Sequence, residues 1–424
     1  MKPDRARRAY HRPMRGEEDG SAALGMPGPA RGSRLSGAVG AALRRPGFVR
    51  AEAAAWALAL VGAVVLLAAI LVFQGSRGSG YDFAAYDAAA RRLAAGQPLY
   101  QPETQGGPFA PGPGGLYLYP PPLSVLLLAL VPLSPAWAAA AWESLHVAAL
   151  VAACAILPAP RWVRLAAFGI ACLSLPTLLD LNLGNVSLFV LLAGAAAWRW
   201  SVRPLGGALA GATAVLAIAV RPQVAILPAW WALCRRAAPI AGAAVLGAVL
   251  LAGSALVAGG GAWLDYVRLL LNLRGAGTAS SDVGLATLAA RAGFAEPLPT
   301  LAFALGAVLA LAAVVAASRR DAESGLVATI VATLLVVPLL WPHYLTLLTL
   351  PAALLASRGR PWGLALPLLA WLPAPLLPLV ALAGCWAPLL GPAGSRARPP
   401  QETGPAGSNG ALRDRAAAGP GRAV

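Results

Sequence analysis

The sequence contains little charge for its length. Only 12% of its 424 residues are Asp, Glu, Lys or Arg, whereas about 25% is usual in soluble globular domains. Hydrophobic residues make up 58% of the chain and gather in long runs between Ala53 and Leu390. Because one membrane-spanning helix needs about 20 apolar residues, this composition argues against a soluble enzyme. It predicts an all-α polytopic membrane protein with about 12 transmembrane helices.

Cysteine and histidine are scarce as well. The four cysteines lie within or at the ends of apolar runs and form no Cys-x-x-Cys or Cys/His cluster, so neither a disulfide framework nor structural zinc is supported. We expect them to be buried structural thiols. The sequence also lacks an Asp-x-Asp pair. We therefore expect no cofactor and no obligatory metal, since clustered carboxylates are what divalent ions prefer.

The formal net charge is +16, almost all of it from arginine. The basic residues form short clusters between apolar runs rather than one patch, which indicates membrane topology and not nucleic-acid binding. Placing the N-terminus in the cytoplasm puts most of them on the cytoplasmic side. The sequence thus predicts disordered basic cytoplasmic tails at 1–50 and 392–424, and a transmembrane catalytic domain at 51–391.

The apolar runs and the polar residues between them define the expected spans. These are residues 54–73, 136–157, 164–179, 186–200, 205–220, 222–234, 238–259, 299–317, 325–340, 344–356, 362–377 and 378–391. Several are at or below the usual length of a span, so half-helices or re-entrant turns remain open. The apolar stretch 121–133 is too short to cross and is interpreted as interfacial or re-entrant.

Two of the predicted outer loops are long. The first, 74–120, contains an amphipathic pattern from Asp82 to Leu93 that predicts a short interfacial helix ending at Gly96. The second, 260–298, has a Gly/Ser/Thr-rich centre that fits a mobile substrate loop or a plain connector equally well.

Four polar residues are predicted to lie where a span meets the outer surface: Asp82, Asn185, Arg221 and His343. Polar residues at membrane depth are costly and usually functional. Asp82 could act as a general base, or cap the amphipathic helix. Arg221 could bind phosphate oxygens with its planar fork, or extend to the lipid headgroups. His343 could hold a phosphate or transfer a proton, or be structural.

A second pair of polar residues lies inside a predicted span. Glu143 and His146 are three positions apart on one helical face, and we expect them to pair with each other. Intramembrane pairs of this kind also occur in secondary transporters, which is the main alternative function. A noncatalytic scaffold in lipid-linked glycan assembly is a third hypothesis.

Six segments occur in the order found in a known family. They are YDFAAYDAAARRLAAGQPLYQP, LYLYPPPLSVLLLALVPL with AWAAAAWESLH, LNLGNVSLFVLLAGAAAW, AIAVRPQ and VVPLLWPHYLTLLTLP. Together they cover roughly residues 80 to 355 and resemble glycosyltransferase family 87. Its members are polyprenyl-phosphate-mannose-dependent α-1,2-mannosyltransferases of the GT-C superfamily.

The resemblance implies a GT-C-type helix bundle with its active site on the extracytoplasmic side of the cell membrane. It implies Asp82 as the catalytic base, Arg221 and His343 at the donor phosphate, and a substrate cavity formed with Tyr86, Asp87, Tyr117, Tyr119, Asn185 and Tyr344. The implied partners are a polyprenyl-phosphate-linked sugar, a glycolipid or glycan acceptor hydroxyl, and membrane lipids. The anomeric configuration would invert.

The sequence departs from the family pattern at some of these positions. Asn185 stands where Gln is frequent, and Arg221 replaces the usual Lys. An arginine keeps the attraction for phosphate but changes its geometry. The resemblance therefore predicts a hexose, with mannose as the first expectation, and leaves the sugar and the acceptor open.

Overall fold

The structure is a computed structural model, and it describes residues 46–74, 80–102, 104, 115–203, 205–272, 282–337 and 339–392. The chain divides into a unit of residues 1–50 and a unit of residues 51–424. The two predicted tails lie almost wholly outside the described residues, as does most of the Gly/Ser/Thr-rich centre of the second long loop. In the described ranges the chain forms helices and turns and no strand, as the sequence predicts.

The α-helices are α2 (Pro46–Phe73), α3 (Tyr81–Ala94), α5 (Pro121–Leu127), α6 (Pro135–Ile156), α7 (Arg161–Leu173), α8 (Leu175–Leu183), α9 (Ser187–Ser201), α10 (Gly207–Ile218), α11 (Ile226–Leu233), α12 (Ala237–Ala258), α13 (Gly260–Asn272), α14 (Leu285–Arg291), α15 (Leu298–Arg320), α16 (Ala322–Ala332), α17 (Thr349–Ser357) and α18 (Leu377–Trp386). Tighter 3₁₀ segments are η1 (Leu128–Leu130), η2 (Pro222–Ala225), η4 (Pro342–Leu348), η5 (Pro361–Trp371), η6 (Ala374–Leu376) and η7 (Ala387–Leu389).

Four helices of the described chain, α2, α6, α12 and α15, are long and apolar enough to cross a membrane. Counting the bent pair α7 and α8 as one broken span gives up to 5. These four helices correspond to the expected spans 54–73, 136–157, 238–259 and 299–317. Large apolar side chains on their surfaces are exposed, such as Leu60 on α2 and Leu256 on α12, which suits a lipid environment. The structure does not confirm the expected count of about 12.

Of the other expected spans, 186–200 and 205–220 form the short continuous helices α9 and α10, and several of the rest are interrupted. The segment 164–179 is broken between Leu173 and Leu175, and the two helices meet at an angle of 63°. Residues 342–348 and 361–371 form 3₁₀ helices, each with proline at its start and the second with Pro367 inside it. Proline removes a backbone donor and clashes with the preceding turn. A hydropathy profile averages over such breaks and therefore does not reveal them.

Small residues allow several helices to pack closely. A Cβ added to Gly211 of α10 would lie 1.8 Å from the carbonyl oxygen of Pro239, and one added to Gly242 of α12 would lie 1.9 Å from that of Ala208. Side chains are therefore excluded where α10 and α12 cross. Close contact through glycine and alanine is a common way for helices to associate inside a membrane.

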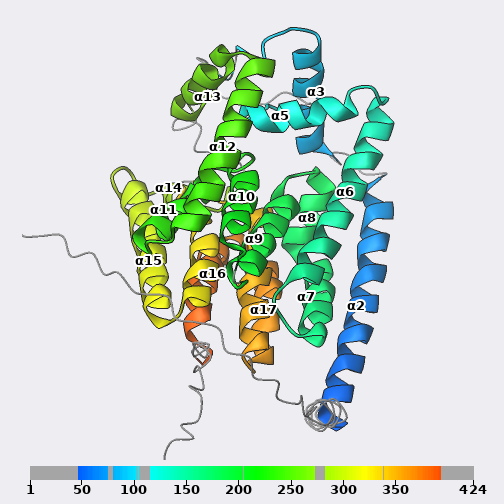
Figure 1. The fold of residues 1–424 in the computed structure, drawn as a ribbon, viewed down its shortest axis with the longest axis vertical. Helices are drawn as coiled ribbons and strands as arrows, with labels where there is room; N and C mark the ends of the chain where they lie inside the picture. The colour runs from blue at the N-terminus through cyan, green and yellow to red at the C-terminus, as the bar shows by residue number, and fades with distance from the viewer. Residues whose placement is uncertain are drawn as a thin grey trace, which may run out of the picture. The chain divides into compact units, whose positions relative to one another are not determined.

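The predicted amphipathic helix is confirmed as α3. It ends at Ala94, and Gly96 follows with φ of 69°, a left-handed conformation that glycine adopts without strain. Figure 1 shows α3, α5 and α13 at the same end of the bundle, and α5 contacts both of the others. Helix α5 with η1 is short, as expected for 121–133.

A polar cluster of Trp198, Asp321, Glu323 and Arg358 connects α9, α16 and the end of α17. Arg358 donates to Asp321 at 2.9 Å and to Glu323 at 2.9 Å, and the indole of Trp198 donates to Glu323 at 2.6 Å. Asp321 also caps α16 by accepting from the backbone N–H of Ser324 at 2.8 Å. Because the donors from Arg358, Trp198 and Ser324 each meet a carboxylate oxygen, this cluster serves as a structural anchor.

The cysteines are all free. Cys154, Cys172 and Cys385 are buried as expected, but Cys234 is exposed. The expectation of burial was wrong for Cys234 because the chain turns after α11 there, at the C-terminal end of that helix.

Candidate active site

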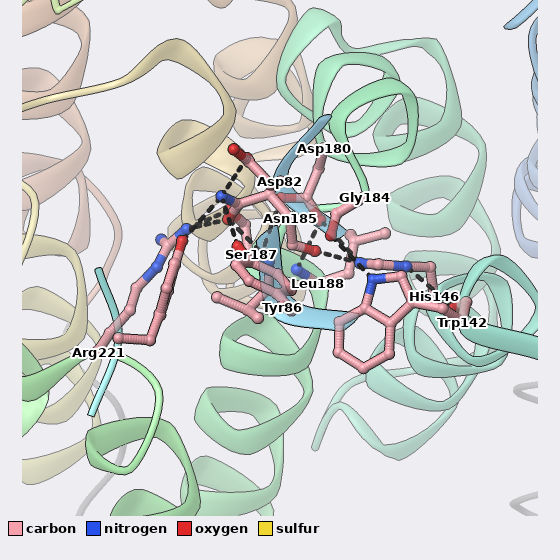
Figure 2. A network of polar contacts seen from close by, with 12 residues as sticks. Asp82, Tyr86, Trp142, His146, Asp180, Gly184, Asn185, Ser187, Leu188 and Arg221 are labelled. Atoms are coloured by element: carbon pink, nitrogen blue, oxygen red, sulfur yellow. Dashed lines mark hydrogen bonds and ion pairs between the residues drawn. The ribbon is translucent and has the colours of Figure 1, made fainter. Parts of the chain in front are cut away.

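The side-chain amide of Asn185 is the centre of a network of polar contacts (Figure 2). Its nitrogen donates to a carboxylate oxygen of Asp82 at 2.7 Å and to the hydroxyl of Tyr119 at 3.0 Å, and lies 3.3 Å from that of Tyr86. Its oxygen accepts from Arg221 at 2.8 Å. One amide thus joins an acid, two phenols and a cation that come from distant parts of the sequence.

Asn185 is held by the turn between α8 and α9. Gly184 ends α8 with φ of 69°, and an added Cβ there would lie 2.8 Å from the Cβ of Phe83. Glycine is therefore required both by the backbone and by the approach of α3. The indole of Trp142 donates to the carbonyl oxygen of Gly184 at 2.8 Å, and its ring stacks on Phe83 at 5.4 Å. These contacts fix the turn against α3 and α6.

The buried carboxylate of Asp180 fixes the same turn from the other side. It accepts from the backbone N–H groups of Ser187 at 3.0 Å and Leu188 at 3.1 Å. These are among the first donors of α9, which have no partner within the helix. A negative charge is also favoured at a helix N-terminus. Asp180 therefore holds the start of α9 and, with it, the turn before the helix, which contains Asn185.

His146 contacts this turn and does not pair with Glu143, so that prediction was wrong. The ring nitrogens of His146 lie within hydrogen-bonding distance of the carbonyl oxygens of Trp142 and Asn185. The Nε2 atom also lies 3.8 Å from Asp180. Glu143 instead bonds the side chain of Gln74. One helical turn places the two side chains on the same face, but the polar groups of the α8–α9 turn are the better partners for His146.

Asp82 lies in the first turn of α3 and does not cap it. The N-cap is Gly80, whose N–H donates to the carbonyl oxygen of Asn182 at 2.7 Å. Burial raises the pKa of Asp82 to about 6, and the charge of Asp180 acts in the same direction, whereas the hydrogen bond from Asn185 and the charge of Arg221 lower it. A carboxylate with this pKa is ionised at neutral pH and is a better base than an ordinary aspartate.

Arg221 follows α10 in an extended conformation, with φ of −140°. The next residue is Pro222, and a residue before proline is disfavoured in a helix. The chain therefore leaves the helix where the guanidinium must enter the network. This group donates to Asn185 and Ser187 and lies 3.5 Å from the ring centroid of Tyr344. Its Nε atom is buried and has no hydrogen-bond partner.

His343 lies beside this group at the start of η4. Its ring stacks on Trp341 with centroids 6.0 Å apart and meets Tyr344 edge-on at 4.9 Å. The Nε2 atom of His343 and the indole nitrogen of Trp341 are both buried without a hydrogen-bond partner. Burying a polar group without a hydrogen-bond partner costs free energy, and one explanation for such groups is that they bind a ligand.

A cavity of about 360 Å³ opens next to the network. Its wall includes Tyr119, Arg221 and Tyr344 from the network, together with Leu118, Val220, Pro222, Gln223, Tyr266, Leu270, Val337, Leu339 and Trp341. A smaller, apolar cavity of about 170 Å³ has Pro222 and Tyr266 in common with it and extends along α10 and α12. Polar and aromatic groups thus line one end of a cavity system that is apolar at the other.

The structure places two of the sequence-predicted cavity residues outside the network. Asp87 forms a partly buried ion pair with Arg91 at 2.8 Å, and Arg91 also donates to the carbonyl oxygens of Val131 and Leu133. Tyr117 is buried, and its hydroxyl donates to the carbonyl oxygen of Pro120 at 2.7 Å and accepts from the N–H of Ser124 at 3.0 Å. Tyr117 therefore shapes the turn that carries Tyr119.

Several residues of the site were not selected from the sequence. These are Asp180, Ser187, Gln223, Tyr266 and Trp341. Ser187 and Gln223 lie two positions after Asn185 and Arg221, so proximity in sequence is the signal that could have found them. No group of three or more His, Cys, Asp or Glu residues among the described ranges is arranged to hold a metal ion.

Comparison with known proteins gives a family and no individual relative. Residues 117–342, more than half of the chain, match the family model of glycosyltransferase family 87. Asp82 and Tyr86 precede the matched segment, and Asn185 and Arg221 lie within it. No curated protein and no solved structure matches the chain.

Proposed function

Because this chain belongs to glycosyltransferase family 87, and is thus a membrane glycosyltransferase, we propose that it transfers a hexose, mannose in the first instance, from a polyprenyl-phosphate donor. The acceptor is a hydroxyl of a lipid-linked or cell-envelope glycan on the extracytoplasmic face. The observation that carries the proposal is the shared amide of Asn185, which holds the carboxylate of Asp82 and the guanidinium of Arg221 on opposite sides.

The unpaired nitrogens of Arg221, which lines the cavity, and of His343 beside it in the fold support an anionic donor. The Nη2 atom of Arg221 is used by Asn185 and Ser187, but its Nε atom has no partner, and neither has the Nε2 atom of His343. A phosphate oxygen accepts hydrogen bonds from such groups, and charge-assisted bonds are the stronger ones. Arg221 and His343 are therefore the proposed ligands of the donor phosphate.

The second cavity supports a lipid carrier. Its lining is apolar and includes Ile218 and Leu250 on facing helices. It shares the wall residues Pro222 and Tyr266 with the first cavity, which Arg221 also lines. A polyprenyl chain leaving a phosphate at Arg221 would be accommodated between α10 and α12, where contact with apolar side chains replaces contact with lipid. A nucleotide-sugar has no group that needs such a surface.

The proposed chemistry uses the network as follows. Asp82 accepts the proton of the acceptor hydroxyl, whose oxygen forms a bond to the anomeric carbon of the donor. The bond between that carbon and the phosphate oxygen breaks on the opposite face, so a β-linked donor gives an α-linked product. Negative charge grows on the departing phosphate, and Arg221 stabilises it, which is commonly the largest contribution of an active site.

The alternative of a secondary transporter has less support. Its two expected residues are not paired, and His146 contacts backbone carbonyls of the turn that holds Asn185. Its position is thus explained by the architecture of the site.

Reconstitution tests the proposed function. Purified protein in vesicles is given a cell-envelope glycolipid fraction and either polyprenyl-phosphate-mannose, polyprenyl-phosphate-glucose or the corresponding nucleotide sugars. We expect transfer from a polyprenyl-phosphate donor only, an α-linkage in the product by NMR, and no change in rate with EDTA. Transfer from a nucleotide sugar, or a rate restored by Mg²⁺ after EDTA, would contradict the proposal.

A further inference from the structure

Asp282 is a buried acid that the catalytic network does not use. It lies just before α14 with no exposed surface. Its Oδ1 atom accepts from the backbone N–H of Gly284 at 2.8 Å and from that of Leu340 at 2.9 Å, and its Oδ2 atom accepts from the hydroxyl of Thr287. Both carboxylate oxygens are thus occupied, although Leu340 lies 58 positions away in the sequence.

A second hydrogen bond holds the same segment. The N–H of Val283 donates to the carbonyl oxygen of Leu340 at 2.8 Å. The peptide groups on both sides of Leu340 are therefore bonded to residues 282–283. The neighbours of Leu340 in the sequence, Leu339 and Trp341, line the large cavity, and His343 and Tyr344 follow. Asp282 itself is not part of the cavity wall.

From these contacts we infer that Asp282 is a positioning residue, which fixes the segment 339–344 as the wall of the donor cavity. The inference rests on the proposed function for the identity of the ligand. Through Tyr344, whose ring lies 3.5 Å from the guanidinium, the segment also determines where Arg221 can lie. Loss of the anchor displaces the groups that contact the donor, whereas Asp82 and Asn185 keep their own anchors on α3 and α8.

The pattern of contacts distinguishes positioning from a chemical role. In Asp282→Asn the amide oxygen still accepts from Gly284 and Leu340, and the amide nitrogen donates to Thr287. In Asp282→Ala all three bonds are lost. Thr287→Val removes only the bond to Thr287. If Asp282 acted as an acid, a base or a metal ligand, asparagine would be as harmful as alanine.

The test combines amide hydrogen exchange with steady-state kinetics on the full-length protein in detergent. In Asp282→Ala we expect faster exchange in the peptide that contains Leu340 and a donor KM raised about tenfold to a hundredfold. The kcat should change less than KM. Asp282→Asn should restore both properties to near the wild-type values, and Thr287→Val should lie between.

Asp321→Ala is the matched control, since Asp321 also caps a helix and is bonded to a distant segment, but at the α16 cluster. It should lower thermal stability and leave the donor KM unchanged. Unchanged exchange at Leu340 in Asp282→Ala, an unchanged donor KM, or equal harm from asparagine and alanine would each overturn the inference. If the wild-type protein transfers no sugar, the proposed function fails instead, and hydrogen exchange still decides whether Asp282 anchors the segment.

Discussion

The side-chain nitrogen of Asn185 lies 2.7 Å from the carboxylate of Asp82, although 103 positions separate the two residues. The amide bonds the Oδ2 atom of Asp82 and leaves the Oδ1 atom to accept a proton. A cation in place of this amide would lower the pKa of Asp82 and so make it a weaker base.

Replacing the proposed base should abolish transfer. In Asp82→Asn we expect kcat to fall about 10²- to 10⁴-fold, the usual contribution of a general base. The protein should remain folded, because Asp82 makes no cap bond that α3 needs. Radiolabelled sugar transfer and thermal unfolding in detergent measure the two effects.

The control for that variant is Glu296→Gln, which removes the charge of an exposed carboxylate outside the network. It should leave kcat unchanged. Transfer by Asp82→Asn at the wild-type rate would remove Asp82 from the role of base.

The pH dependence should report the pKa of Asp82. The base acts when ionised, and its pKa is raised to about 6, so kcat/KM should be constant near neutral pH and fall as the pH drops below about 6. In Asn185→Asp a second negative charge replaces an amide that lowers this pKa, so the acid limb should move to higher pH. An acid limb near pH 4 in the wild type would contradict the assignment.

Arginine should be required at 221 for more than its charge. Arg221→Lys keeps the charge but loses the fork that donates to Asn185 and Ser187, and we expect a donor KM raised about tenfold. Arg221→Ala should raise it about a hundredfold. The acceptor KM should change little in either variant, which initial rates at varied donor and acceptor will measure.

Arg268→Ala is the matched control, since Arg268 forms an exposed pair with Asp265 on α13. Its kinetics should equal those of the wild type. Equal effects of Arg221→Ala on donor and acceptor would argue against contact with the donor phosphate.

Gly184 should tolerate no side chain. Gly184→Ala combines a left-handed backbone with a Cβ 2.8 Å from that of Phe83, next to Asp82. We expect a loss of about 1–3 kcal/mol in stability from the backbone alone, a further loss from the collision, and a reduced kcat. In the matched variant Gly96→Ala, φ is also 69° but nothing lies within 4 Å, so only the backbone cost should appear. Equal stability and activity of the two variants would show that the collision is relieved.

The sidedness of the site can be measured with the exposed thiol of Cys234. The arginine pattern places it in the cytoplasm and α3 outside. In intact cells a membrane-impermeant maleimide should leave Cys234 unlabelled and should label a cysteine introduced by Ala95→Cys after α3. The other three cysteines are buried and give little background. Labelling of both positions, or of Cys234 alone, would contradict an extracytoplasmic site.

Much of the site could be predicted because its residues carry their own signals. Asp82, Asn185 and Arg221 are polar residues beside apolar runs, and such residues are costly unless they meet. The helix that carries Asp82 was predicted from its amphipathic pattern and from Gly96. Asp87 has the same local pattern, but it pairs with Arg91 one turn later, a spacing that favours an ion pair on a helix and that the choice of site residues did not consider.

The parts that could not be predicted depend on backbone groups. Asp180 and Asp282 accept from N–H groups of Ser187 and Leu340, and every residue type except proline offers such a donor. No residue pattern therefore marks these contacts. The breaks in the expected spans could not be predicted from hydropathy for a related reason, since the 3₁₀ segment at 361–371 is an apolar helix by composition.

The break between α7 and α8 has a consequence for the position of Asn185. Helix α8 has 9 residues and ends at Gly184, so its length alone sets how far Asn185 stands from the bend. One inserted turn would shift that amide by about 5 Å, which no side-chain rotation could recover. The length of α8 therefore determines where Asn185 lies relative to the bend, and a change in the length of a distant loop leaves that spacing unchanged.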